Sequence, residues 1–171
     1  MKKIVLAGYM ASGKTTIALL LSKASGLEYI DLDDFIEQKV GKTIAEIFNS
    51  KGEIYFRRLE HESLKEILAK NTGYVVSLGG GTPCYANNHV LLQGENVVSV
   101  YLKASIQELA SRLRDMRQSR PLIANVADSE LEEFIAKHLF DRSYYYNQAK
   151  HVVVVDGKLP EAIVNEIMSL Y

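Results

Sequence analysis

The segment that most constrains this chain is residues 8–15, GYMASGKT, which has the form G-x-x-x-x-G-K-[ST]. It follows the apolar run Ile4–Ala7 and leads into TIALLL, a segment with the composition of a helix. The two glycines let consecutive backbone N–H groups turn inward around an anion, and the following helix adds the positive end of its dipole. A buried strand, a glycine-bounded loop and a helix in this order predict a phosphate-binding loop.

The loop also assigns chemistry to its last residues. We expect the ammonium of Lys14 on the β- and γ-phosphates of a nucleotide, and the hydroxyl of Thr15 on Mg²⁺. The residues expected to hold the nucleotide are Ala11, Ser12, Gly13, Lys14, Thr15 and Thr16. The alternative is a strand-to-helix turn that contains Lys-Thr by coincidence. It is disfavoured because both glycines, the lysine and the flanking pattern occur together.

The composition indicates a globular chain of 171 residues, with 47% hydrophobic and 24% charged residues, and we expect one domain over residues 1–171. The 20 basic residues are balanced by 21 acidic ones, so no nucleic-acid partner is expected. Cys84 is the only cysteine, which excludes a disulfide framework and a multi-cysteine zinc site. The four histidines lack the spacing of a metal site or of a nucleophile and its base, so we expect no chemistry from them.

The apolar run at the start of the chain superficially resembles a signal peptide. It is broken at Gly8 and passes directly into the phosphate-binding loop, so cleavage there would destroy the motif. No run approaches the ~18 apolar residues that a membrane span needs. We therefore expect a cytoplasmic protein without a membrane partner.

Strand and helix signals alternate along the chain. We expect strands at about 2–7, 28–31, 74–78, 97–102 and 151–156. Helices are expected from the phosphate-binding loop to 25, from 33 or 34 onward, at about 43–51, 53–70, 86–93, 105–117 and 129–149, and from 160 onward, with capping boxes at Thr43, Ser105 and Ser129. Several strands are continuous β-branched runs, which are typical of a parallel sheet covered by helices on both faces. Such sheets bind ligands at the carboxyl ends of their strands.

Three aspartates, Asp31, Asp33 and Asp34, stand at the end of the second expected strand and just after it. In an extended segment residues i and i+2 face the same side, so Asp31 and Asp33 are expected to point together into the cleft. One carboxylate would hold Mg²⁺ through a water, and the other would accept the proton of an acceptor hydroxyl and orient it. A helix N-cap is the alternative, but it needs only one of the three.

The glycines Gly79–Gly81 end the third expected strand. Three glycines in a row carry a large entropic cost, so a plain turn explains them poorly. They favour the close approach of a ligand to exposed backbone amides.

Two positions carry arginines that suit a second ligand. Arg57 and Arg58 lie in an expected helix with glutamates three or four residues away, so surface ion pairs are an equally good explanation for them. Arg142 has no acidic residue three or four positions away. Its planar fork therefore favours a carboxylate of the ligand.

A basic segment, which contains Arg112, Arg114, Arg117 and Arg120, precedes Pro121. A solvated helix face is one explanation. Because a residue before proline avoids the helical conformation, Arg120 is instead expected in an extended loop. A mobile loop tipped with arginine suits phosphoryl transfer, since its closure brings positive charge to the γ-phosphate and excludes water. We therefore expect a lid at about residues 112–125.

Taken together, these segments resemble those of the shikimate kinase family, within the nucleoside monophosphate kinase-like P-loop group. The resemblance covers almost the whole chain and is carried by segments 8–15, 31–33, 52–58, 77–81 and 120–122, and by Arg142 with Tyr146. It implies an α/β fold with a five-stranded parallel sheet of strand order 2-3-1-4-5, flanked by helices and completed by a lid. It also implies transfer of the γ-phosphate of ATP to the 3-hydroxyl of shikimate, which gives 3-phosphoshikimate and ADP on the route to chorismate and the aromatic amino acids.

The resemblance also assigns roles by position. It implies Lys14, Asp33 and Arg120 as catalytic residues, with Arg120 also contacting the nucleotide. The residues implied to bind shikimate are Asp33, Arg57, Gly79, Gly80 and Arg142, with a shikimate-binding segment at about 32–60. Thr15 and Asp31 are implied at the metal, Asp31 through a water. One Mg²⁺ per subunit, ATP as co-substrate and a monomer complete the expectation.

Several points stay open at this level. Ala11 stands where the family often has a further glycine, and Arg112 or Arg114 is expected near adenine together with segment 156–160. Asp33 is either a general base or only an orienting group. The rival functions are another small-molecule kinase of the same fold, such as a gluconate kinase, and a nucleotide-binding regulatory module without turnover. A GTPase switch is disfavoured because no N-K-x-D segment occurs.

Overall fold

A single parallel sheet forms the centre of the molecule. The computed structural model describes residues 2–171, so Met1, the first residue of the expected domain, lies outside the described part. The strands are β1 (Lys3–Ala7), β2 (Glu28–Asp31), β3 (Tyr74–Ser77), β4 (Val97–Lys103) and β5 (His151–Val154), in the order β2-β3-β1-β4-β5. This sheet confirms the expected fold class and strand order. Because β1 is central, the loop after it emerges in the middle of the carboxyl edge.

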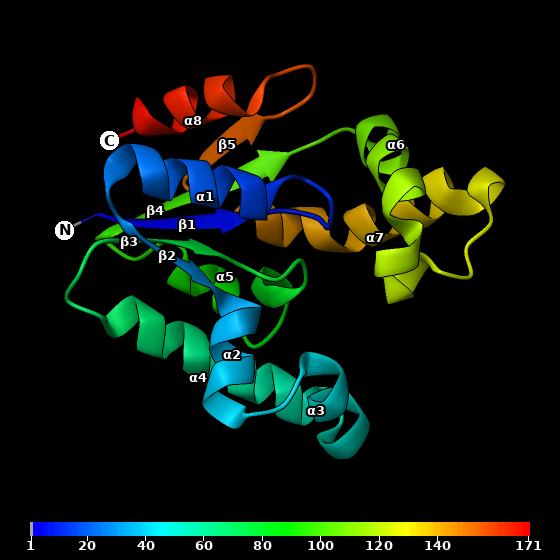
Figure 1. The fold of residues 1–171 in the computed structure, drawn as a ribbon, viewed down its shortest axis with the longest axis horizontal. Helices are drawn as coiled ribbons and strands as arrows, with labels where there is room; N and C mark the ends of the chain where they lie inside the picture. Colours follow the sequence, from blue (N-terminus) through cyan, green and yellow to red (C-terminus); the bar gives the residue numbers. More distant parts are fainter. Residues whose placement is uncertain (1) are drawn as a thin grey trace.

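Helices cover both faces of the sheet (Figure 1). α1 (Lys14–Ser25) and α8 (Pro160–Met168) lie on one face, and α4 (Glu53–Ala69) and α5 (Asn88–Leu91) lie on the other. The other helices are α2 (Leu32–Val40), α3 (Ile44–Lys51), α6 (Ile106–Met116) and α7 (Leu131–Tyr146), with 3₁₀ turns at Thr82–Cys84, Arg117–Ser119, Pro121–Ile123 and Asp128–Glu130. In Figure 1, α6 and α7 project beyond the carboxyl end of the sheet, and α7 runs back toward it.

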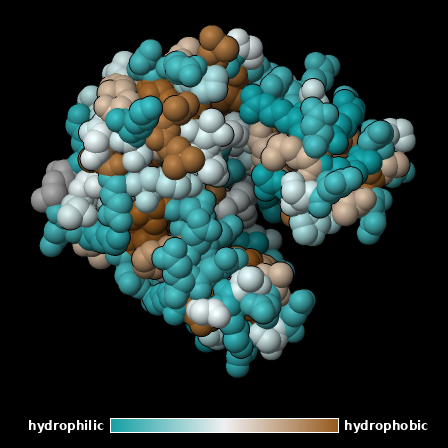
Figure 2. All heavy atoms as spheres, viewed as in Figure 1, coloured by the Kyte–Doolittle hydropathy of each residue, from teal (hydrophilic) through white to brown (hydrophobic). Residues whose placement is uncertain are grey.

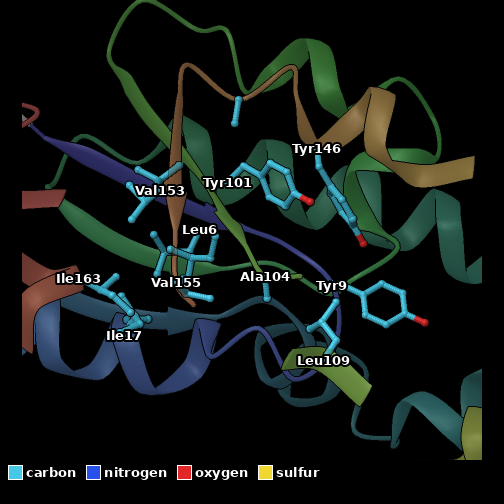
Figure 3. Close-up of a cluster of buried hydrophobic side chains, with 14 of the residues drawn as sticks. Leu6, Tyr9, Ile17, Tyr101, Ala104, Leu109, Tyr146, Val153, Val155 and Ile163 are labelled. Atoms are coloured by element: carbon cyan, nitrogen blue, oxygen red, sulfur yellow. The ribbon is translucent and has the colours of Figure 1, made fainter. Parts of the chain in front are cut away.

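Alternate residues of β1 enter two separate cores. Ile4 and Leu6 pack in a core that also contains residues of α1, α6, α7 and α8 (Figure 3). Val5 and Ala7 pack in a second core with residues of α2, α3 and α4. All four side chains are fully buried. Burial on both faces accounts for the uninterrupted apolar sequence of the strand.

Of the three expected capping boxes, one is complete, one is half formed and one is absent. Thr43 forms a complete capping box with Glu46. The side chain of Ser105 accepts a hydrogen bond from the backbone N–H of Glu108, but the carboxylate of Glu108 accepts from Arg112 and does not complete the box. The box expected at Ser129 is wrong, because this residue lies inside a 3₁₀ turn and α7 begins only at Leu131. A residue inside a helical turn lacks the extended backbone of a side-chain cap.

Two expected helices are shorter in the structure. The helix expected at 86–93 is reduced to the four residues of α5, because Ala86 and Asn87 have φ values of 51° and 56° and interrupt helical geometry before it. The helix expected to reach 149 ends at Tyr146. Both differences lie at element ends, where side-chain pattern constrains the backbone least.

The molecule is hollowed on its carboxyl-end side. Figure 2 shows a deep notch between the body around the sheet and the projection formed by α6 and α7. Across residues 2–171, none of the helices combines the length and the apolar character that crossing a bilayer requires.

Candidate active site

The loop between β1 and α1 has a backbone that only particular residues tolerate. A Cβ on Gly8 would lie 2.8 Å from the carbonyl oxygen of Leu102 and 2.8 Å from the hydroxyl of Ser12. Gly13 forms the N-cap of α1 in the left-handed region, with φ of 95°. Both glycines of the motif are therefore required by geometry, as expected for a loop that turns its amides toward an anion.

Ala11 takes a left-handed conformation, with φ of 63°, at the position where the family often has a glycine. For a residue with a Cβ this conformation costs about 1–2 kcal/mol. The loop thus keeps the backbone shape of a glycine while carrying an alanine, and stores a small strain next to the site.

Lys14 lies over the loop that precedes it. Its ammonium donates hydrogen bonds to the carbonyl oxygens of Gly8, at 2.7 Å, and Tyr9, at 2.9 Å. Burial, and then the positive charge of Arg120, lower the pKa of Lys14 to about 7, against the opposing effect of Asp33. Because a phosphate would restore the charged form of the ammonium, the site favours an anion at this point.

The arginines of the basic segment around residue 112 differ in their contacts: some face the phosphate-binding loop or the cavity, and others form ion pairs with acidic side chains. Arg112 donates to Glu108 and, at 3.1 Å, to the carbonyl oxygen of Ala11, so it lies across the phosphate-binding loop. Arg114 and Arg117 form ion pairs with Glu132 and Asp128, as on a solvated helix face. Arg120 lies between two 3₁₀ turns in an extended conformation, as the following proline predicts.

Asp31 is the N-cap of α2, which corrects the geometric argument from the sequence. Its Oδ1 accepts hydrogen bonds from the backbone N–H groups of Asp33 and Asp34, and its Oδ2 accepts from the hydroxyl of Ser77 at 2.9 Å. Asp33 is therefore inside the first turn of α2 and not on a shared extended face with Asp31. Both carboxylates nevertheless line the same cavity.

The surroundings of Asp33 disfavour the ionised form of its carboxyl group. Burial, then the neighbouring carboxylates Asp31 and Glu60, raise its pKa to about 6, and the ammonium of Lys14 only partly opposes them. A carboxylate in this state binds a proton or a hydroxyl donor more readily than a solvated one.

Each glycine of Gly79–Gly81 faces a different charged side chain. A Cβ on Gly79 would lie 3.4 Å from Oδ1 of Asp33, one on Gly80 would lie 3.5 Å from Nη1 of Arg142, and one on Gly81 would lie 2.9 Å from Nη2 of Arg57. The triplet therefore brings an acid and two guanidinium groups around one stretch of bare backbone. Binding at this stretch explains the three glycines better than a turn does, because none of them has a positive φ.

Arg57 is held from several sides. Its Nη1 donates to the Oε1 of Glu60 at 2.9 Å, and its guanidinium lies 3.9 Å from the ring centroid of Tyr85. Glu60 is 1% exposed, and its other carboxylate oxygen accepts from the hydroxyl of Thr82. The ion-pair explanation of Arg57 is thus confirmed, and the pair with the buried Glu60 holds the guanidinium at the smaller of two adjoining cavities. The ligand-binding explanation stays a prediction.

Arg142 contacts aromatic groups in place of an acid. Its positive charge lies close to Tyr146, whose hydroxyl donates to the carbonyl oxygen of Gly80. Its guanidinium carbon lies 5.9 Å from the ring centroid of Tyr9. No ion pair of Arg142 occurs among residues 2–171, so its charge is available to a ligand, as the sequence predicts.

Two adjoining cavities connect these groups. The larger has a volume of about 520 Å³ and is lined by the phosphate-binding loop, Asp31, Arg112 and Arg120. The smaller has about 300 Å³ and is lined by Phe56, Arg57, Arg142 and the glycine triplet. The residues common to both are Met10, Asp33, Gly79, Gly80 and Arg120. A group in one cavity can therefore meet a group in the other beside Asp33 and Arg120.

The structure brings most of the residues expected at the site into these two cavities. Ser12 is an exception, because it is 1% exposed and lines neither cavity, and segment 156–160, expected near adenine, also lines neither. Sequence reasoning missed Tyr9 and Tyr29, and treated Glu60 only as a surface partner. The hydroxyl of Tyr29 lies 3.2 Å from the hydroxyl of Ser77 and 3.3 Å from Oδ2 of Asp31. This contact could have been predicted, because Tyr29 and Asp31 are two residues apart in β2 and therefore point to the same face. No sequence pattern indicates that Glu60 is buried or that Tyr9 contacts His138.

Comparison with known proteins finds one family over nearly the whole chain. The sequence model of the shikimate kinase family matches residues 10–171. A shikimate kinase of Flavobacterium johnsoniae is 54% identical over 170 residues, covering 99% of each chain. The crystal structure of a shikimate kinase from Bacteroides thetaiotaomicron has a TM-score of 0.89 at 34% identity, covering 99% of this chain and 97% of that one. A shikimate kinase from Acinetobacter baumannii in complex with shikimate has a TM-score of 0.85 at 30% identity, covering 99% and 92%.

Proposed function

The chain belongs to the shikimate kinase family, and from this premise we propose that it transfers the γ-phosphoryl group of ATP to the 3-hydroxyl of shikimate. The products are 3-phosphoshikimate and ADP, and the step belongs to the synthesis of chorismate and the aromatic amino acids. The observation that carries the proposal is the pair of adjoining cavities, which meet at Asp33 and Arg120. One contains the phosphate-binding loop, and the other contains Arg57 and Arg142.

The larger cavity is the proposed nucleotide side. Backbone amides of the loop after β1 and the start of α1 bind the phosphates, together with the ammonium of Lys14. Arg120 borders both cavities, so its guanidinium neutralises charge on the group in transfer. Arg112, which already contacts Ala11 and lines this cavity, is the better of the two arginines for the adenine end.

The residues present fit a magnesium ion bound together with the nucleotide. Thr15 offers a hydroxyl at the edge of the cavity, and Asp31 has one carboxylate oxygen on the cap of α2 and the other toward Ser77, which suits contact through a water. Mg²⁺ needs few protein ligands because phosphates and waters complete its shell. When bound, one ion per subunit neutralises phosphate charge.

The smaller cavity is the proposed acceptor side. Arg57 and Arg142 bind the carboxylate of shikimate from two directions, and the backbone of Gly79 and Gly80 forms the floor between them. Asp33 accepts a hydrogen bond from the 3-hydroxyl and aligns its oxygen with the γ-phosphate. Its raised pKa also suits it to take the proton as the new O–P bond forms.

The same proposal extends to the organisation of the protein. Residues 1–171 form one kinase domain, in which segment 32–60 contributes to the acceptor side and segment 112–125 is a lid over the nucleotide. We further propose a monomer that acts in the cytoplasm, without nucleic-acid or membrane partners.

The test is ADP production with shikimate and with a panel of other hydroxy acids that includes gluconate. We expect turnover with shikimate to exceed turnover with every other acceptor by at least 10²-fold, because two fixed guanidinium groups and one carboxylate define a rigid acid of one size. Turnover of gluconate at a comparable rate would identify the rival kinase. Binding of ATP without ADP production from any acceptor would identify a regulatory module.

A further inference from the structure

One face of α7 carries four side chains at four-residue intervals: Phe134, His138, Arg142 and Tyr146. Residues four apart on a helix lie above one another, so these side chains form a single row. Arg142 and Tyr146 reach the acceptor side through Gly80. His138 belongs to the same row, and neither the sequence patterns nor the proposed reaction gives it a role.

His138 contacts the phosphate-binding loop. Its Nδ1 lies 2.8 Å from the hydroxyl of Tyr9, and the two rings meet edge to face with centroids 5.7 Å apart. Tyr9 is 1% exposed, and in Figure 3 its ring lies at one end of the core cluster with its hydroxyl pointing away from the labelled residues. A buried phenol needs a hydrogen-bond partner, and His138 is the partner that the structure supplies.

Tyr9 therefore has a contact toward each substrate. Its carbonyl oxygen accepts a hydrogen bond from the ammonium of Lys14, at 2.9 Å, on the nucleotide side. Its ring lies 5.9 Å from the guanidinium carbon of Arg142, on the acceptor side. The ammonium of Lys14 has three N–H donors, so it can bind a phosphate while it still donates to the carbonyl oxygen of Tyr9. A phosphate on Lys14 therefore acts directly on the position of Tyr9. Lys14, Tyr9 and Arg142 thus form one chain of contacts from a nucleotide phosphate to the carboxylate of the acceptor.

We propose that Tyr9 and His138 are positioning residues that couple nucleotide binding to acceptor binding. The hydrogen bond between them ties α7, and with it the guanidinium of Arg142, to the phosphate-binding loop. A nucleotide that fixes the loop thereby fixes Arg142 for the acceptor, and the acceptor then binds a site that is already ordered. This inference rests on the proposed function, because it needs both substrates to bind.

The test measures shikimate binding by calorimetry, with and without a saturating non-hydrolysable imido analogue of ATP and Mg²⁺. For the unmodified protein we expect the nucleotide analogue to lower the Kd of shikimate by about 5-fold or more. Tyr9→Phe keeps the ring and removes the hydroxyl. We expect it to reduce this coupling factor to below 2, while the Kd of the nucleotide analogue alone changes by less than about 3-fold.

His138, on α7, offers a matched pair of variants. His138→Asn places an amide where Nδ1 lies and should keep the coupling factor within about 2-fold of the unmodified value, whereas His138→Leu should abolish the coupling. Tyr144→Phe is the control, because Tyr144 is 63% exposed on the same helix and makes no hydrogen bond through its hydroxyl among the described residues. If Tyr9→Phe fails to fold, the His138 pair decides alone.

The outcomes separate this inference from the proposed function. If the unmodified protein neither binds nor phosphorylates shikimate, the proposed function fails. If it does both but shows a coupling factor below 2, or if Tyr9→Phe and His138→Leu keep the full factor, the coupling inference is overturned and the proposed function stands. Equal loss of coupling in His138→Asn and His138→Leu would also overturn it, since a hydrogen bond would then not be the cause.

Discussion

The two sides of the active site are built in opposite ways. The phosphate-binding part of the nucleotide side is one continuous segment, residues 8–15 with the start of α1, whose backbone amides, lysine and threonine come from neighbouring positions. Asp31, Arg112 and Arg120 join it from other elements. The acceptor side is assembled from α2, α4, the glycine triplet after β3, and α7, which lie up to about a hundred residues apart in the sequence. The phosphate-binding segment needs only the local path of the chain, whereas the acceptor side needs the whole fold.

This difference predicts which kinetic parameter a substitution on each side changes. A change on the nucleotide side acts directly on the phosphates and on the rate of transfer. A change on the acceptor side acts on the position of a guanidinium that another element holds, so it should appear first in the KM for the acceptor. Five substitutions test this contrast, from the largest expected effect to the smallest.

Lys14→Met removes the ammonium that binds the loop carbonyls and that we propose to bind the phosphates. We expect kcat to fall by about 10³-fold or more, because a preorganised charge at the transferred group is lost. Steady-state ADP production measures this. Lys23→Met, at an exposed position of the same helix, should keep full activity. Retention of more than a tenth of kcat in Lys14→Met would contradict its assigned role.

Asp33→Asn should separate activity from stability. We expect turnover to drop by about 10²-fold or more, with the Kd of ATP nearly unchanged. The pKa of Asp33 is raised to about 6, so the folded state binds its proton more tightly than the unfolded state, and ionisation destabilises the fold. The variant should therefore be more stable than the unmodified protein by about 2 kcal/mol above pH 6, with the difference disappearing below about pH 4. Denaturant titration across this range checks it, and a less stable variant at pH 7 would refute the assigned environment.

Arg142→Met removes a guanidinium that forms no ion pair within residues 2–171. We expect the KM for shikimate to rise by about 10²-fold, since truncating one partner of a buried charge pair costs about 2–5 kcal/mol. The KM for ATP should change little. Lys137→Met is the matched control, because this lysine is 76% exposed on the same helix. Parallel losses for both substrates would mean that Arg142 supports the fold and not the acceptor.

Gly81→Ala tests the position of the other arginine. Gly81 has φ of −89° and ψ of −14°, so alanine fits its backbone, but the added Cβ would lie 2.9 Å from Nη2 of Arg57. Arg57 is held by Glu60 and Tyr85, so it must leave its present position. We expect the KM for shikimate to rise by about 10-fold, which corresponds to about 1.4 kcal/mol. An unchanged KM would show that Arg57 does not need this position.

Ala11→Gly should have the smallest effect, and on stability alone. Glycine relieves the left-handed conformation at φ of 63° but adds freedom to the unfolded chain, so the net gain should be about 0.5 kcal/mol. Thermal unfolding should show a Tm higher by about 1–2 °C. A lower Tm would mean that the methyl group of Ala11 contributes packing that outweighs the strain.

The sequence by itself determined the fold class, the strand order through a family resemblance, and the phosphate-binding loop. Prediction from the sequence is most accurate where the residues that carry the pattern are also the residues that form the structure, as in the loop of residues 8–15 and the capping box at Thr43. It also identified Arg142 correctly as an arginine without an ion pair, because the absence of a helical partner is a local property. It was wrong at Ser129 and in the shared face of Asp31 and Asp33, where a turn and an N-cap replaced the conformation assumed.

Only the tertiary structure decided how the acceptor side is held. The burial of Glu60, the approach of Arg57 to Gly81 and the contact of Tyr9 with His138 all join residues from separate elements. Periodicity and spacing describe which residues share a face of one helix or strand, and they carry no information about which faces meet. The distances between elements are set by the packing of two cores around the sheet, so the residues that position the arginines emerge only when those cores are formed.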